Sequence, residues 1–193
     1  MSFPGFALRA AILLLAAALC RPAAASYITV MPSRGGVVVS LSGKIEHGDT
    51  DRLEALLDGR TKAGVRVHAV ALNSPGGYLI EGLAMADLVR ERRMTTFAWD
   101  TCASACFVVY AAGAKKLATP MARLGVHTAY EQGGSISSKA TETMAAACRR
   151  FGVPPSVLAK MARTKAPDIA WITRREARAM GVRQIKVRPS GEG

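Results

Sequence analysis

The sequence has 193 residues, of which 50% are hydrophobic and only 6% aromatic, and its formal net charge is +12 at pH 7. This length fits one domain with a largely aliphatic core, and the composition excludes a disordered, collagen-like or membrane-bundle protein. The positive charge favours anionic partners, but no zinc-finger spacing, RNA-binding motif or basic run with interleaved aromatics accompanies it. We therefore expect no nucleic-acid partner and keep nucleic-acid binding only as a weaker alternative.

Residues 1–25 are predicted to be a secretory signal peptide. Arg9 precedes a short apolar run at residues 10–19, and residues 23–25 are all alanine, which suits cleavage before Ser26. The run is too short to span a bilayer comfortably, so an uncleaved membrane anchor is the alternative. The mature chain is then expected to be periplasmic or secreted, with a formal charge of +10 after two arginines leave with the leader. Association with a membrane is not expected after cleavage.

The remaining chain predicts alternating strands and helices. Apolar and β-branched runs predict strands at residues 36–42, 65–72, 94–98, 116–118 and 124–126. Helical spacing predicts helices that begin at residue 49 and end near residues 59–64, and at residues 79–92, 104–112, 139–151, 155–163 and 173–180. This alternation predicts an α/β fold whose parallel strands are covered by helices. We expect one domain over residues 26–188 and a flexible tail at residues 189–193.

Local signals predict where some helices begin and end. The acidic segment at residues 49–51 offers an N-cap and a first turn for the first helix. Gly113 is expected to be the C-cap of the apolar helix before it. Thr173 and Glu176 have the spacing of a capping box, and Gly181 is expected to end the last helix.

Export of the chain would place its cysteines where they can form disulfides. An oxidising compartment permits disulfides, and Cys102 and Cys106 lie four residues apart, so they would share one face of a helix. A disulfide between them is one interpretation, and two small buried side chains at the start of a helix are the other. Cys148 makes the count of the mature chain odd. Three cysteines without clustered histidines do not make a zinc site, so we expect no metal and no cofactor.

Two segments offer parts of a hydrolytic site. The turn Asn-Ser-Pro-Gly-Gly at residues 73–77 joins a strand to a helix, and Gly76 and Gly77 leave backbone N–H groups open to an oxyanion. Ser104 follows a strand at the start of the apolar helix, between Ala103 and Ala105. Helix capping is the alternative role for this serine.

A histidine and an acid could complete the site. His127 follows a short apolar strand and could take the proton of a nucleophilic serine, although a packed histidine is the alternative. Asp168 is the best candidate to orient the imidazole, with Asp100 as its competitor. A serine–lysine dyad is a further possibility, for which the candidate bases are Lys115, Lys116 and Lys139.

Taken together, these segments resemble the proteolytic subunit of the Clp protease. The carriers of the resemblance, in order, are Asn-Ser-Pro-Gly-Gly at 73–77, Ala-Ser-Ala at 103–105, Ala-Ala-Gly-Ala-Lys at 111–115 and Arg-Leu-Gly-Val-His at 123–127. Their order and approximate spacing match that family, and Glu176-Ala177 with Gly181-Val182 resembles its closing segment. The similarity runs from about Val37 to Val187. The paired cysteines and the leader are more similar to an exported bacterial branch.

The resemblance implies a ClpP/crotonase-like fold of repeated ββα units and a serine hydrolase site. The implied roles are nucleophile for Ser104, base for His127, orienting acid for Asp168, and oxyanion donors at Gly76 or Gly77 and at Ala105. It also implies a homo-oligomer. The interval of 41 residues between His127 and Asp168 is shorter than the family's, which argues against the long helical arm and the double ring.

These features lead to one expected function and two alternatives. Because a secretory compartment is not expected to supply ATP, we expect no ATPase partner and an ATP-independent serine peptidase that acts on peptides or unfolded protein segments. The first alternative is a non-catalytic binding or assembly protein on the same scaffold, since a fold does not fix a function. The second is an acyl-transfer enzyme of the crotonase type.

Overall fold

The computed structural model describes residues 26–33, 35–131 and 134–185. The predicted signal peptide and the predicted tail at residues 189–193 lie outside these residues. The described part holds an eight-stranded sheet with the order β1-β2-β3-β4-β5-β8, in which β6 pairs with both β4 and β7. Its strands are β1 (Tyr27–Ser33), β2 (Gly36–Ser42), β3 (Val67–Ser74), β4 (Thr95–Ala103), β5 (Lys115–Ala118), β6 (Arg123–Val126), β7 (Ala170–Trp171) and β8 (Val182–Gln184).

The strands are mostly parallel, as the alternation of strands and helices predicted. β2, β3, β4, β5 and β8 pair parallel to one another in that order, and β6 is parallel to β4. Only β1 and β7 run antiparallel to their neighbours. The predicted α/β class is confirmed, and the mixed sheet with its helices is consistent with a ClpP/crotonase-like fold.

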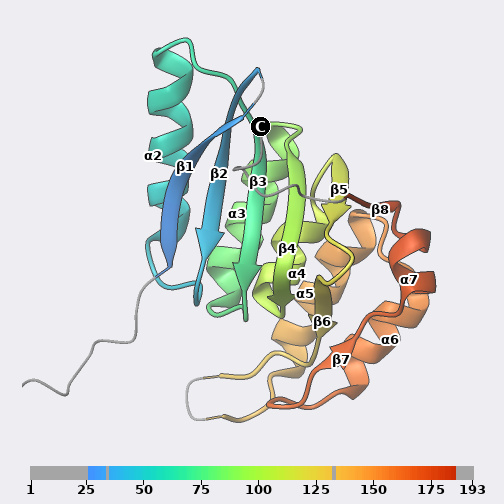
Figure 1. Ribbon diagram of the computed structural model, residues 1–193. Coiled ribbons are helices and arrows are strands. Elements are labelled where there is room, and N and C mark those ends of the chain that lie inside the picture. Colours follow the sequence, from blue (N-terminus) through green and yellow to red (C-terminus); the bar gives the residue numbers. More distant parts are fainter. Residues whose placement is uncertain (1–25, 34, 132–133, 186–193) are drawn as a thin grey trace, which may run out of the picture.

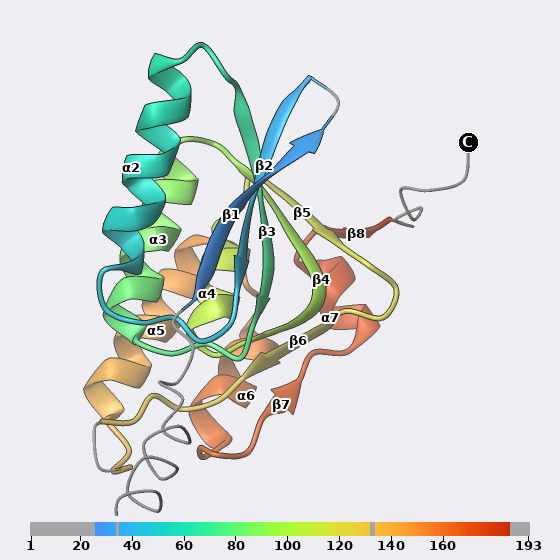
Figure 2. The same cartoon turned by 60° about the vertical axis from the view of Figure 1, so that its left-hand side comes forward.

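Helices gather on one side of the central strands (Figures 1 and 2). They are α2 (Asp49–Lys62), α3 (Leu79–Glu91), α4 (Ala105–Ala111), α5 (Ser138–Arg150), α6 (Pro155–Arg163) and α7 (Arg174–Ala179). Every residue of α4 is buried, and this helix contacts α3, α5, β3 and β4. The uniformly apolar sequence of α4 therefore places it at the centre of the core. Within the described residues, no helix combines the length and hydropathy needed to cross a bilayer.

Several predicted element ends are wrong by a few residues. β3 continues through Ser74 and β4 through Ala103, because β4 changes partner along its length. Its first half pairs with β5 and its last residues pair with β6. Cys102 therefore lies in a strand and not on a helix. β1, β7 and β8 were not predicted from the sequence.

Two of the predicted caps are wrong and one is confirmed. Gly48, in the left-handed conformation, occupies the N-cap position of α2, whereas Asp49 and Asp51 form its acidic first turn as predicted. Ala112 is the C-cap of α4, and Gly113 has another role, because an added Cβ there would lie 2.2 Å from Thr96 Oγ1. The capping box of Thr173 and Glu176 is present at α7.

Candidate active site

Three segments that are distant in the sequence meet at the carboxyl edge of the parallel strands. The register pairs Ser74 with Cys102, and Ala103 with Gly125. The residues that follow β3, β4 and β6 therefore emerge side by side, at the lower edge of the sheet in Figure 1. In open α/β sheets, ligands bind beyond the carboxyl ends of the strands. Gly76, Ser104 and His127 all lie at this edge.

The two glycines of the turn occupy positions that a side chain cannot share. An added Cβ on Gly76 would lie 2.7 Å from Ser104 Cβ and 3.0 Å from the nitrogen of Ala105. An added Cβ on Gly77 would lie 2.0 Å from the carbonyl oxygen of Ile45. The φ angles are 99° and 151°, which L side chains rarely adopt. The turn therefore packs its bare backbone directly against the segment that carries Ser104.

Hydrogen bonds to Ile45 fix the orientation of this turn. The N–H of Ile45 donates to the carbonyl of Gly76 at 2.8 Å, and the N–H of Tyr78 donates to the carbonyl of Ile45 at 3.0 Å. In a trans peptide the carbonyl and the following N–H point in opposite directions, so the N–H of Gly77 points away from Ile45. The N–H of Gly76 donates to Ser74 Oγ at 3.1 Å. Of the two glycines, only Gly77 keeps a backbone donor without an acceptor among the described residues.

Glu81 holds the loop that contains Ile45. Its carboxylate accepts hydrogen bonds from the N–H groups of Gly48 and Thr50, each at 2.9 Å, and from the hydroxyl of Thr50. Burial disfavours the ionised carboxylate, but these donors outweigh it and lower the pKa of Glu81. An ionised Glu81 thus ties the start of α3 to the start of α2. This fixes the loop that contains Ile45, which precedes α2, against the glycine turn, which precedes α3.

Ser104 lies at a sharp corner between β4 and α4. Its φ is 55° and its ψ is −126°, which is unusual for a residue with a side chain. The residue is half-buried, and its N–H donates to the carbonyl of Gly125 at 3.1 Å. It occupies the N-cap position of α4, but its hydroxyl accepts no capping hydrogen bond. Ser104 therefore takes the N-cap position that the alternative predicted, but without the side-chain hydrogen bond of a capping serine.

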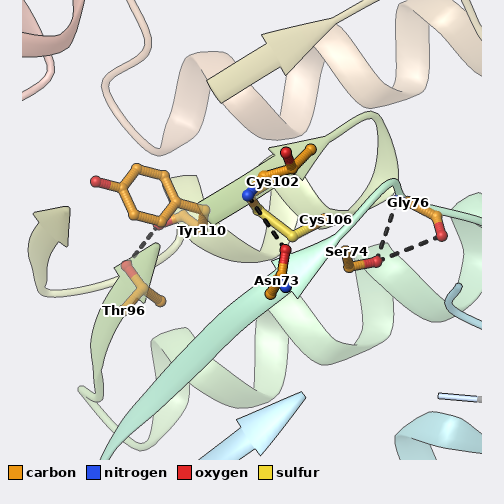
Figure 3. Close-up of a disulfide and its surroundings, with 8 residues drawn as sticks. Asn73, Ser74, Gly76, Thr96, Cys102, Cys106 and Tyr110 are labelled. Atoms are coloured by element: carbon orange, nitrogen blue, oxygen red, sulfur yellow. Dashed lines mark hydrogen bonds between the residues drawn. A yellow bond between two sulfur atoms is a disulfide. The ribbon is translucent and has the colours of Figure 1, made fainter. Parts of the chain in front are cut away.

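A disulfide brackets this corner. Cys102, in β4, and Cys106, in the first turn of α4, are bonded with a Cα–Cα distance of 5.3 Å, and both residues are fully buried (Figure 3). Beside it, Asn73 Oδ1 accepts a hydrogen bond from the N–H of Thr101 at 3.2 Å. Ser104 is thus held by a covalent link between its two flanks. The strand end is also tied to β3.

His127 is 7% exposed. Its Nδ1 lies 2.7 Å from the carbonyl oxygen of Thr128. Because a carbonyl can only accept, this bond requires a proton on Nδ1, so that the neutral ring has its lone pair on Nε2. The ring of Tyr130 stacks on the imidazole, with 5.9 Å between the ring centroids. In the described part of the chain, no hydrogen bond joins the Ser104 hydroxyl to the His127 ring.

The structure places Asp168 near the histidine segment, and no hydrogen bond among the described residues joins its carboxylate to His127. β7 pairs antiparallel with β6, with Ala170 opposite Val126, so the chain before β7 runs beside the residues after β6. Asp168 is exposed, and within residues 26–33, 35–131 and 134–185 its carboxylate accepts no hydrogen bond. The carbonyl of Thr128 occupies the position at Nδ1 that an orienting acid would take.

The structure also locates the alternative candidates for the base and for the orienting acid. Lys115 pairs with Thr95 at the start of β4, whereas Ser104 follows the end of that nine-residue strand. At about 3.3 Å per residue, Lys115 and Lys116 lie at the opposite edge of the sheet, so a dyad between Ser104 and either lysine is excluded. Asp100 and Lys139 are exposed. Within the described residues, no group of three His, Cys, Asp or Glu side chains is placed to hold a metal ion.

Sequence reasoning missed three contributors to this site, namely Ile45, Glu81 and the Thr128 carbonyl. Ile45 and Glu81 act through contacts between segments that are about 30 residues apart, so local patterns carry no signal for them. Glu81 stands in the first turn of α3, a position where an acid is common in any helix. Thr128 acts through its backbone, which any residue type could supply.

Comparison with known proteins gives one family. The family model described as Clp protease matches residues 37–151, a span that includes the glycine turn, Ser104 and His127. A search of curated proteins gave no match.

Proposed function

Because the chain belongs to the Clp protease family, we propose that it is an exported, ATP-independent serine hydrolase that cleaves peptides or unfolded protein segments. The family indicates a serine peptidase-type function, and its members commonly form homo-oligomers. One observation carries the assignment of the site. Gly77, Ser104 and His127 converge at the carboxyl edge of the sheet, with Ser104 on a corner that no capping bond explains.

In the proposed reaction, Ser104 Oγ attacks the carbonyl carbon of a peptide bond. His127 Nε2, which carries the lone pair, takes the hydroxyl proton and then passes it to the leaving amine. The N–H groups of Gly77 and Ala105 donate hydrogen bonds to the oxyanion of the tetrahedral intermediate. Water then attacks the acyl-enzyme. His127 takes a proton from the water and returns it to Ser104 Oγ, so that the carboxylic acid product leaves and the Ser104 hydroxyl is regenerated. The Cys102–Cys106 disulfide acts only by holding the corner.

Asp168 remains the proposed orienting acid. In this role His127 would exchange the Thr128 carbonyl for the Asp168 carboxylate when substrate or a second copy of the chain closes on the site. The same movement would bring Nε2 within hydrogen-bonding distance of Ser104 Oγ.

Covalent labelling with a fluorophosphonate probe tests the proposal. We expect the folded protein to be labelled at Ser104, and the labelling to be lost in Ser104→Ala. Ser156→Ala is the matched control, because Ser156 is an exposed serine in the first turn of α6. Circular dichroism would establish that each variant is folded.

One specific observation favours the alternative of a non-catalytic binding or assembly protein. In the described residues, the Ser104 hydroxyl and His127 are not hydrogen-bonded, and Asp168 is exposed. If the folded protein is not labelled, or if Ser104→Ala is labelled equally, the hydrolase proposal fails and this alternative takes its place.

A further inference from the structure

A cavity lies at the amino edge of the sheet, opposite Ser104. It has a volume of about 470 Å³ and is formed by the turn between β1 and β2 and by the starts of β3, β4 and β5. This edge is uppermost in Figure 1. The cavity is lined by ten residues, among them Arg66, His68, Arg92, Arg93 and Lys115. Its volume falls within the range of small-molecule sites.

The lining is strongly basic. It contains three arginines and a lysine, and none of its ten residues is acidic. Arg92 forms an ion pair with Asp58. Arg66, Arg93 and Lys115 are exposed and have no carboxylate partner within the described part of the chain. Three positive charges therefore face one cavity without compensation.

Positions at helix ends account for only part of this charge. Arg92 and Arg93 directly follow the last residue of α3, where cations interact favourably with the helix dipole. Arg66 and Lys115 lie at the starts of two strands, so that explanation does not apply to them.

We propose that this cavity binds a compact phosphate-bearing anion, either free in solution or in the head group of a lipid. Guanidinium groups match the geometry of phosphate oxygens and donate to them in pairs. A bound dianion would also relieve the mutual repulsion of Arg66, Arg93 and Lys115. The proposal does not depend on the hydrolase chemistry, because the two sites lie at opposite edges of the sheet.

Calorimetric titration with sodium pyrophosphate at low ionic strength tests the proposal. The background is Ser104→Ala, so that the outcome is independent of the proposed hydrolysis. We expect saturable binding at one site per chain, weakened at least tenfold in Arg66→Gln/Lys115→Gln. The control Arg149→Gln/Arg175→Gln removes the same charge from exposed positions on α5 and α7 and should change the affinity less than twofold. The charge-preserving pair Arg66→Lys/Lys115→Arg should retain binding.

Sedimentation with phosphatidylglycerol vesicles, compared with phosphatidylcholine vesicles, distinguishes the two sources of phosphate. Pyrophosphate binding without vesicle binding identifies a free anion. Selective loss of phosphatidylglycerol binding in Arg66→Gln/Lys115→Gln identifies a head group. If neither probe binds, or if the control pair loses as much binding as the cavity pair, only bulk charge is involved and the proposal is overturned.

Discussion

At the scale of single residues, the glycine turn beside Ser104 depends on its close approach to the backbone of Ile45. Gly77 has φ 151° and leaves no room for a Cβ beside the Ile45 carbonyl. We therefore expect Gly77→Ala to lower the free energy of unfolding by at least about 2 kcal/mol, from strain and steric overlap, and to abolish fluorophosphonate labelling. Urea unfolding measures the first effect.

Gly59 provides a matched glycine for this comparison. It lies within α2, and an added Cβ there would meet no atom within 4 Å. Gly59→Ala should raise the free energy of unfolding by up to about 1 kcal/mol, because alanine loses less backbone entropy in a helix. Equal effects of the two substitutions would contradict the close approach at Gly77.

Substitutions of His127 and Asp168 should lower kcat by different factors. His127→Ala should lower peptidase kcat on the order of 10⁴–10⁶-fold, as the loss of a triad base does. Asp168→Asn should lower kcat by at most about 10⁴-fold, since the Thr128 carbonyl can hold the Nδ1 proton when the carboxylate is lost. Both are measured with a fluorogenic peptide. No loss in Asp168→Asn would remove Asp168 from the mechanism.

The residues that the sequence predicted share a simple property. Gly76, Gly77, Ser104 and His127 each follow a strand of a parallel sheet, and such strand ends gather at one edge whatever the details of packing. The sequence could not decide whether Gly76 or Gly77 is the free donor, because the answer depends on Ile45, which is about 30 residues away. The orientation of Asp168 is likewise a property of the folded loop.

At the scale of elements, the disulfide should support the join between β4 and α4. It closes a small loop, and the entropy of such a loop in the unfolded chain corresponds to about 2 kcal/mol of stability. We expect Cys102→Ala/Cys106→Ala to lose stability of this order and to be labelled more slowly at Ser104. Urea unfolding and the time course of labelling provide the two measurements.

Reduction and a second cysteine variant make the disulfide prediction specific. Dithiothreitol should destabilise the natural sequence and leave Cys102→Ala/Cys106→Ala unchanged. Cys148 is a buried free thiol, so Cys148→Ala should retain its sensitivity to dithiothreitol. If reduction leaves both stability and labelling unaffected, the disulfide does not hold the corner.

The elements that were missed are those with the least local sequence signal. β7 and β8 have two and three residues, which is too short for any periodicity. β1 alternates exposed and half-buried residues and contains a proline, and it gains its structure by pairing along β2. The extension of β4 to Ala103 depends on β6, a partner that emerges only in the folded chain. Long apolar elements such as α4 and β2 were predictable because burial alone selects them.

At the scale of the whole molecule, the sheet separates two kinds of chemistry. The carboxyl edge carries Ser104 and His127, and the amino edge carries the basic cavity. Strand direction produces this separation, since each crossover helix returns the chain to the amino edge before the next parallel strand begins. Substitutions at one edge should therefore leave the other intact. This independence allows the hydrolase and the anion site to be tested separately.

Export of the chain would account for both the leader and the disulfide. The full chain, expressed in a bacterium that has a periplasm, should be recovered from that compartment beginning at Ser26, as N-terminal sequencing would show. Because the periplasm permits disulfides, denaturation should leave only Cys148 open to alkylation. A chain started at Ser26 and kept in the cytosol should instead expose all three cysteines of the mature sequence. Leu13→Arg, which interrupts the apolar run of the leader, should retain the full chain in the cytosol with reduced thiols. Recovery of the uncleaved chain from membranes would establish the anchor alternative, and cytosolic retention of the natural sequence would refute export.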